Sequence, residues 1–257
     1  MRITILGCGT SGGVPRPGGK DGKGEWGAAD PADPRNRRRR CSILVQDKGK
    51  TVLVDTSPDL RCQLLDASVQ QIDAVLWTHD HADQLHGIDD LRPFMLRHGL
   101  IESWSDARTY GVLQRRFGYC FVQEGYYGAI YRHNLIEGPF RAAGIAVTPI
   151  PQDHGSIPSL GFRFGRFAYA NDVVELPEEA FEVMAGVEVL VVDAMRYRPH
   201  PTHAHLDRTL GWIERIGPQR AFLTNLHVDM DYAELDRQTP GHVHPCHDGM
   251  TIEVDGE

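Results

Sequence analysis

The sequence lacks any apolar run that approaches the roughly 20 residues needed to cross a membrane. Its opening, MRITILGCGTSGG, reaches glycine too soon for a signal peptide. The five cysteines are odd in number and include no Cys-x-x-Cys pair, which argues against a disulfide framework or a structural zinc knuckle. These absences predict a protein of the reducing cytoplasm with no membrane partner.

An excess of positive charge is also lacking. Lys and Arg number 27 against 35 Asp and Glu, which gives a formal net charge of −8. A field of that sign repels a long nucleic-acid backbone, so nucleic acid is a less favoured partner. The local exception, Arg35–Arg40, reads RNRRRR. We interpret it as a solvated loop, with a phosphate-facing patch as the alternative.

The order of the predicted elements indicates an α/β fold. The chain has 257 residues and no linker or repeat that would divide it, so we expect one domain over 1–257. The first part is rich in predicted strands, and later strands alternate with helices, which suggests two packed sheets with helices outside. The predicted strands are 3–6, 42–46, 51–55, 74–77, 145–150, 162–164, 167–170, 187–192, 221–224 and 250–254. The predicted helices are a segment from 57 with Leu60, Leu64 and Leu65 on one face, then 88–96, 177–184, 206–216 and 232–237. Segments 14–40 and 100–140 show no clear period.

The strongest chemical signal is Thr78–Gln84, THDHADQ, which follows the predicted strand 74–77 directly. Two histidines at i and i+2 in a rigidly held loop can point one nitrogen each at a common ion. Zn²⁺ favours imidazole with a nearby carboxylate, and Mn²⁺ or Fe²⁺ can use the same set. A single His-x-His is more often a chance occurrence, so its context decides.

Further residues that can bind metal lie just past other predicted strands. They are Asp55, His154, Asp172, Asn225 and His227. Any one of them alone would usually be structural. Several such strand ends together with the His-x-His motif predict one shared metal site on one rim of the sheets.

The glycine-rich segment Gly7–Gly13 follows the first predicted strand. It lacks the Lys-Ser/Thr of a phosphate-binding P-loop and has no clean GxGxxG pattern. We interpret it as a place where the backbone passes close to the rim of the active site.

A family resemblance rests on several motifs spread over nearly the whole chain. The sequence resembles metallo-β-lactamase-fold hydrolases, and more closely the branch that contains phosphoribosyl 1,2-cyclic phosphate phosphodiesterase and ribonuclease Z-like proteins. The resemblance implies a four-layer αββα sandwich. The motifs are GCGTSGGVP at 7–15, VDT at 54–56, HDHADQ at 79–84, GIDDLR at 87–92, His154, Asp172, PTH at 201–203 and DGM at 248–250.

The resemblance also implies a ligand set for two ions. Asp55 would steady the loop that carries the ligands. The implied first site consists of His79, His81, His154 and Asp172, and the second uses Asp83 and Asp172.

The chain departs from the family pattern at two positions, both in the second site. Gln84 stands where the family has a histidine, and Asn225 stands where the family has the His that follows its last strand. Amide oxygens bind metal weakly and suit hard ions better than zinc. We therefore expect one strongly bound divalent ion, Zn or Mn with Fe as an alternative, and a second site that is weak or absent. His227 and the histidine-rich segment 242–247 offer substitutes, although we interpret that segment as an exposed loop.

The implied chemistry is hydrolysis by a metal-bound hydroxide, because a bound divalent ion lowers the pKa of its water toward ~7. Asp83 would orient that water, and His203 would protonate the leaving alkoxide. His200 and His205 are the alternatives for this role, and His203 could instead be a structural residue at a helix start. The expected substrate is a small or cyclic nucleotide-like phosphodiester, and the chain allows a homodimer. The alternatives are a ribonuclease Z-like nuclease and a degenerate metal- or ligand-binding protein.

Overall fold

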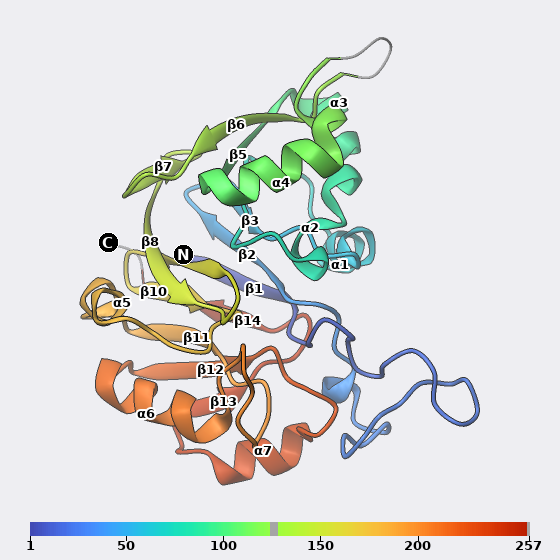
Figure 1. Ribbon diagram of the computed structural model, residues 1–257, viewed down its shortest axis with the longest axis vertical. Coiled ribbons are helices and arrows are strands. Elements are labelled where there is room, and N and C mark those ends of the chain that lie inside the picture. The colour runs from blue at the N-terminus through green and yellow to red at the C-terminus, as the bar shows by residue number, and fades with distance from the viewer. Residues whose placement is uncertain (124–127, 256–257) are drawn as a thin grey trace.

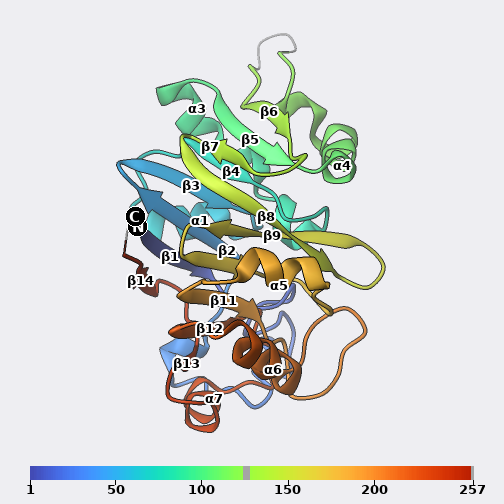
Figure 2. The same ribbon diagram turned by 90° about the vertical axis from the view of Figure 1, so that its left-hand side faces the viewer.

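Two β-sheets packed face to face form the centre of the molecule, and helices cover the outer face of each (Figures 1 and 2). The computed structural model describes residues 1–123 and 128–255. Residues 124–127, in the aromatic middle segment, therefore lie outside the described residues. The layer order confirms the predicted αββα sandwich.

The first sheet changes from antiparallel to parallel pairing at its middle strand. β14, β1, β2 and β3 pair antiparallel, and β3 to β6 pair parallel. The parallel strands therefore end on the same edge of the sheet. In spatial order the strands are β14 (Thr251–Glu253), β1 (Arg2–Gly7), β2 (Ser42–Asp47), β3 (Lys50–Val54), β4 (Ala74–Leu76), β5 (Ile101–Ser105) and β6 (Tyr131–Leu135).

The second sheet has the same mixed character. β7 to β10 are joined by antiparallel pairs, and β10 to β13 are parallel. β8 therefore runs in the same direction as β10, and it ends on the same edge of the sheet as β10 to β13. In spatial order the strands are β13 (Val243–Pro245), β12 (Arg220–Thr224), β11 (Val189–Asp193), β10 (Phe167–Ala170), β9 (Pro158–Phe164), β8 (Ile145–Asp153) and β7 (Phe140–Ala142).

The core between the sheets follows from the alternation of side chains along each strand. Ile3 and Ile5 of β1 point inward and meet aromatic residues such as Phe162 and Phe164 of β9, all of them fully buried. The intervening apolar positions face outward, where they meet helices. The strands thus carry apolar residues on both faces because each sheet is covered on both sides.

Each outer core joins one sheet to its own helices. On the first sheet, Leu6, Leu44 and Trp77 pack with Leu60 and Leu85; on the second, separate apolar positions pack with α5 to α7. The helices over the first sheet are α1 (Leu60–Asp66), α2 (Ala82–Leu85), η2 (Ile88–Leu91), α3 (Arg92–His98), α4 (Ala107–Phe117) and η3 (Gly118–Cys120). Those over the second are α5 (Glu178–Met184), α6 (Leu206–Ile216) and α7 (Tyr232–Gln238), and η1 (Pro34–Asn36) lies in the loop after β1.

Three local expectations are corrected by the structure. The histidine-rich segment is not an exposed loop, because 243–245 form the edge strand β13 with Val243 and Cys246 buried. Leu65 does not share the buried face of α1, since 62% of its surface is exposed. Arg38 is not solvated: it is 2% exposed and donates to the carbonyl oxygens of His227 and Met230.

The two ends of the described chain meet at one edge of the first sheet. The amino group of Met1 donates to the carbonyl of Val254 at 2.8 Å, beside the β1–β14 pair. Within 1–123 and 128–255, no helix combines the length and the apolar character that crossing a bilayer requires.

Candidate metal centre

The candidate site lies on the rim where the parallel strands of both sheets end. Asp55 and Asn225 directly follow β3 and β12. Asp172 lies two residues past the end of β10, and His79 lies three residues past the end of β4. Asp55, Asp172 and Asn225 have φ values of 63°, 54° and 62°. This left-handed backbone is uncommon outside glycine and is best tolerated by Asp and Asn. Each residue therefore turns the chain sharply at the strand end, and such strain clusters at functional sites.

Three histidines converge at this rim. The ring centroids of His79 and His81 are 4.6 Å apart, and His154, at the end of β8, lies 5.0 Å from each of them. One ligand atom from each of the three lies within 4.8 Å of the others. His79 and His154 are each 1% exposed, and His81 is the most exposed of the three. The predicted His-x-His ligands and His154 therefore come together.

Hydrogen bonds fix the orientation of two of these rings. Asp55 accepts bonds from the backbone N–H and the hydroxyl of Thr78, both at 2.9 Å, and the Thr78 oxygen lies 2.9 Å from Nδ1 of His79. With the Thr78 hydroxyl donating to Asp55, the Nδ1–H of His79 donates to Thr78. The Nε2 of His79 is then a free lone pair, and it is buried with no hydrogen-bond partner. Nδ1 of His154 similarly lies 2.6 Å from the Thr202 carbonyl, which leaves its Nε2 facing the cluster.

Burial keeps the imidazoles of His79 and His154 neutral, as metal ligands must be. It lowers the pKa of His79 well below its usual value, with further lowering from the neighbouring histidines. Burial, followed by the charge of His203, lowers the pKa of His154 to about 3.

A second group of possible ligands adjoins the first. One ligand atom each of His154, Asp172 and His203 lies within 4.8 Å of the others. Nδ1 of His203 lies 2.9 Å from Oδ2 of Asp193 and 3.7 Å from Oδ1 of Asp172. Burial opposes protonation of His203, but the Asp193 carboxylate outweighs it and raises the pKa of His203 to about 9. His203 is therefore an imidazolium at neutral pH, next to the candidate ligands.

Gln84 and Asn225, the two amides at positions where the resemblance implies histidines, both point N–H groups at Asp172. Nε2 of Gln84 lies 3.0 Å from Oδ2 of Asp172, and Nδ2 of Asn225 lies 3.4 Å from its Oδ1. Burial raises the pKa of the Asp172 carboxyl, while His203 opposes that rise. The amide donors thus occupy the directions from which a second cation would approach this carboxylate. Oε1 of Gln84 is buried without a partner.

The other predicted residues are placed less centrally. Asp83, in α2, is bonded by Nε2 of Gln84 at 3.3 Å and belongs to neither group of converging ligand atoms among the described residues. The ring of His200 lies 5.2 Å from that of His203, whereas His205 precedes α6. The ring of His244, in the histidine-rich segment, is bonded to Asp236 at 2.8 Å.

Asp193 is the functional candidate that sequence reasoning did not select. It is fully buried, ends β11, and holds both the ring of His203 and the backbone N–H of Val173. The available signal was an aspartate that closes a very apolar strand, the same pattern that identified Asp55 and Asp172.

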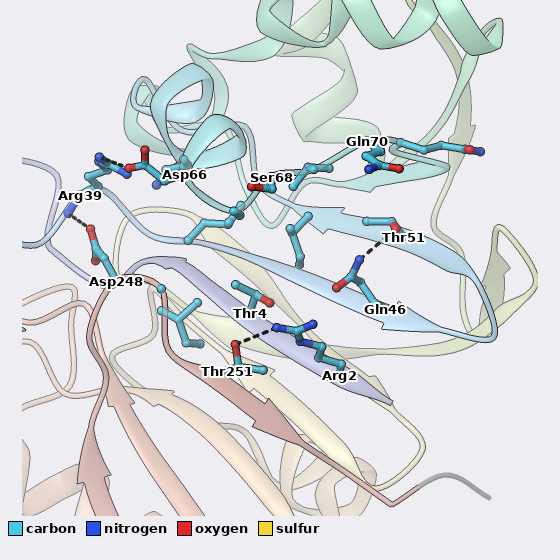
Figure 3. Close-up of a pocket in the computed structure, with 18 of the residues that line it drawn as sticks. Arg2, Thr4, Arg39, Gln46, Thr51, Asp66, Ser68, Gln70, Asp248 and Thr251 are labelled. Carbon is cyan, nitrogen blue, oxygen red and sulfur yellow. Dashed lines mark hydrogen bonds and ion pairs between the residues drawn. The ribbon is translucent and has the colours of Figure 1, made fainter.

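One open cavity lies away from these residues (Figure 3). It measures about 880 Å³ and is floored by the outer face of the first sheet, with Thr4, Gln46 and Thr51 pointing into it. Arg39, bonded to Asp66, and Asp248 lie along one side. None of the candidate ligands lines it, so this cavity is separate from the candidate centre.

Comparison with known proteins identifies the family. The model of the beta-lactamase superfamily domain matches residues 50–226, more than half of the chain. The chain belongs to the β-lactamase superfamily. A crystal structure described as a new diphosphatase from the PhnP family is 33% identical, with a TM-score of 0.90, and the match covers 99% of this chain and 98% of that one. This superfamily member therefore lies in the PhnP branch, which confirms the resemblance.

Two further matches show how far the likeness extends. A curated protein named octanoyltransferase, from Porphyromonas gingivalis (strain ATCC BAA-308 / W83), is 32% identical over 263 residues, covering 99% of this chain and 52% of the relative. The chain thus spans about half the length of that relative. The human short-form tRNase Z is 17% identical with a TM-score of 0.70, covering 99% of this chain and all of that one, which shows a shared fold.

Proposed function

We propose that this superfamily member is a metal-dependent phosphodiesterase that acts on a small or cyclic nucleotide-like phosphate. The observation that carries the proposal is the convergence of His79, His81 and His154 beside Asp172 and the His203–Asp193 pair. Three imidazoles and a carboxylate suit Zn²⁺ or Mn²⁺. The buried, unpartnered Nε2 of His79 fits this assignment, because a buried polar atom without a partner is costly unless something binds it.

The candidate ligands would hold the ion, and other residues would handle the protons. A divalent ion held there would supply two things, a lowered pKa for a nearby water and withdrawal of charge from a phosphoryl oxygen. Asp83 lies in α2, directly after the loop that carries His79 and His81, and would orient the attacking water. His203, protonated at neutral pH, would donate a proton to the leaving oxygen, and Asp193 would keep it charged and oriented.

The relative named a diphosphatase supports a phosphate substrate. A phosphodiester and a substituted diphosphate share one feature, a phosphorus with two bridging oxygens, so one arrangement of acid and ion serves both. The net charge of −8 disfavours a long polynucleotide. A ribonuclease Z-like nuclease is the second candidate, supported by a similar fold. A binding protein with little catalysis is the third, because Gln84 and Asn225 weaken the second site.

The test is turnover of bis(p-nitrophenyl) phosphate by metal-stripped protein to which Zn²⁺, Mn²⁺ or Fe²⁺ is returned. We expect turnover only with metal, and loss of both turnover and bound metal in His79→Ala. His242→Ala, a change at an exposed histidine, is the matched control and should behave as wild type. A panel of cyclic phosphates against a short RNA then separates the first two candidates. Metal binding without turnover of any phosphoester would support the binding protein instead.

A further inference from the structure

One of the three candidate histidine ligands lacks the support that the other two have. Nδ1 of His79 lies 2.9 Å from the hydroxyl oxygen of Thr78, and Nδ1 of His154 lies 2.6 Å from the carbonyl oxygen of Thr202. Within 1–123 and 128–255, the ring of His81 has one hydrogen-bond contact, which is with Nε2 of His154 at 3.3 Å. That partner is itself a candidate ligand. A bond to an outer group normally sets the orientation of a ligand ring, so His81 must be held in another way.

The backbone of His81 is held through the residue before it. Asp80 stands between the two histidines of the His-x-His motif and is 8% exposed. Its carbonyl oxygen accepts a hydrogen bond of 3.0 Å from Nη1 of Arg116. This carbonyl and the N–H of His81 belong to one planar peptide unit. The bond from Arg116 therefore fixes the orientation of the peptide that leads into His81.

A second arginine holds the side chain of Asp80. Nε of Arg108 lies 3.2 Å from Oδ2 of Asp80. The side chain of Asp80 is 10% exposed, whereas that of Arg108 is 49% exposed, so the arginine brings its charge from the surface to a nearly buried carboxylate. A carboxylate so placed is costly without a partner. Asp80 is thus held at its side chain and at its carbonyl by two different arginines.

Both arginines belong to α4, and this helix is itself fixed on the first sheet. Arg108 and Arg116 lie roughly two turns apart, which places them on the same side of the helix. Leu113 is fully buried in the outer core of the first sheet. Asp106 caps the start of the helix by accepting a bond of 2.7 Å from the N–H of Thr109. α4 therefore presents its two donors from a rigid position, as the support of a metal site requires.

We propose that Arg116 and Arg108 are positioning residues for His81 and act on it through Asp80. The inference rests on the metal site of the proposed function but not on its substrate. The ligand loop is then held from both sides, by Asp55 through Thr78 next to His79 and by α4 through Asp80 next to His81. α4 would thus set the affinity and the ligand geometry of the ion, although neither arginine would touch it. A purely structural role of the two arginines would instead lower the stability of the fold and leave metal affinity unchanged.

The test measures metal binding rather than the reaction. Calorimetric titration of metal-free protein with Zn²⁺ gives the affinity, and the visible absorption of the Co²⁺-loaded protein reports the geometry of the ligands. Arg116→Met removes the donor and retains a long side chain. It should weaken Zn²⁺ binding about 10–100-fold, the loss typical of a missing outer partner of a ligand, and should change the Co²⁺ spectrum. Arg116→Lys retains a donor and should recover most of the affinity. Arg115→Met, at the adjacent exposed position of α4, is the matched control and should behave as wild type in both measurements.

Variants at Arg108 keep the test decisive if Arg116→Met folds poorly. Arg108→Met should weaken Zn²⁺ binding about two- to fivefold, the size expected of a partly exposed ion pair, and Arg108→Lys should restore it. Wild-type affinity and an unchanged Co²⁺ spectrum in both Met variants would overturn the positioning role, whatever happens to their thermal stability.

Failure of the proposed function gives a different result. The affinity differences between the variants would then persist, while bis(p-nitrophenyl) phosphate would not be hydrolysed with any metal. A wild-type chain that binds neither Zn²⁺ nor Co²⁺ would overturn both the proposed function and the positioning role.

Discussion

Replacing the two amides at the candidate centre should convert a site for one ion into a site for two. Gln84 and Asn225 donate to Asp172 at 3.0 and 3.4 Å. A hydrogen bond to an ionised group stabilises by about 1.5–3 kcal/mol, so an ion that shares this carboxylate must displace roughly 3 kcal/mol of existing bonds. At about 1.4 kcal/mol per factor of ten, the second ion is weakened about 100-fold.

The double variant Gln84→His, Asn225→His replaces these donors with imidazole lone pairs. Equilibrium dialysis of metal-free protein against Zn²⁺, followed by elemental analysis, should give one tightly bound ion per wild-type chain and two per variant chain. Asn134→His adds an imidazole on β6, away from the centre, and controls for adventitious binding. Thermal unfolding verifies that each variant is folded. Two equally tight ions in wild type, or a single ion in the double variant, would refute the reasoning.

Three further outcomes follow from contacts in the structure. His203→Ala should lower kcat by about 100-fold or more, as expected for a lost proton donor. Its metal content, measured by elemental analysis, should be nearly unchanged. Unchanged turnover would show that His203 takes no part in the reaction. Asp55→Asn should weaken metal binding about 10–100-fold, as loss of support for a ligand does, and calorimetric titration with Zn²⁺ measures it; an unaltered affinity would show that Thr78 alone orients the loop. Burial lowers the pKa of His133 from 6.5 to about 4. The neutral ring therefore stabilises the fold fully above pH 6.5, and this stabilisation is lost as the pH falls toward 4. The reason is that the unfolded chain then binds a proton that the folded ring does not. Between pH 7 and 4.5, denaturant unfolding should show that the free energy of unfolding of wild type falls by about 1–2 kcal/mol more than that of His133→Asn, a value reduced for partial exposure. The control His98→Asn, at an exposed histidine, should follow wild type. Parallel curves for all three proteins would contradict the assignment.

Short-range pattern determined much of the fold in advance. Strands such as β1, β2 and β12 and the amphipathic helix α6 lie where alternation or helical periodicity predicts them. The segment 100–140 gave no such signal, although β5, α4, η3, β6 and β7 lie there. Aromatic residues in this segment pack in both sheets and helices, as the stacked rings of Tyr110 and His133 illustrate, so composition did not distinguish the two. β13 was missed because an edge strand of three residues depends on its neighbour β12 rather than on its own propensity.

The sequence by itself determined which residue types stand at the strand ends, and hence that His79, His81 and His154 could share an ion. Only the tertiary structure decided what those residues face. The N–H groups of Gln84 and Asn225 point at Asp172, and the buried carboxylate of Asp193 favours the protonated form of His203. Both contacts arise because strands distant in the sequence end at one rim. Arg16 and His227, 211 positions apart, meet for the same reason. Periodicity reports how one segment lies relative to its own axis, whereas side-chain orientation at a site depends on packing between segments, which no local pattern records.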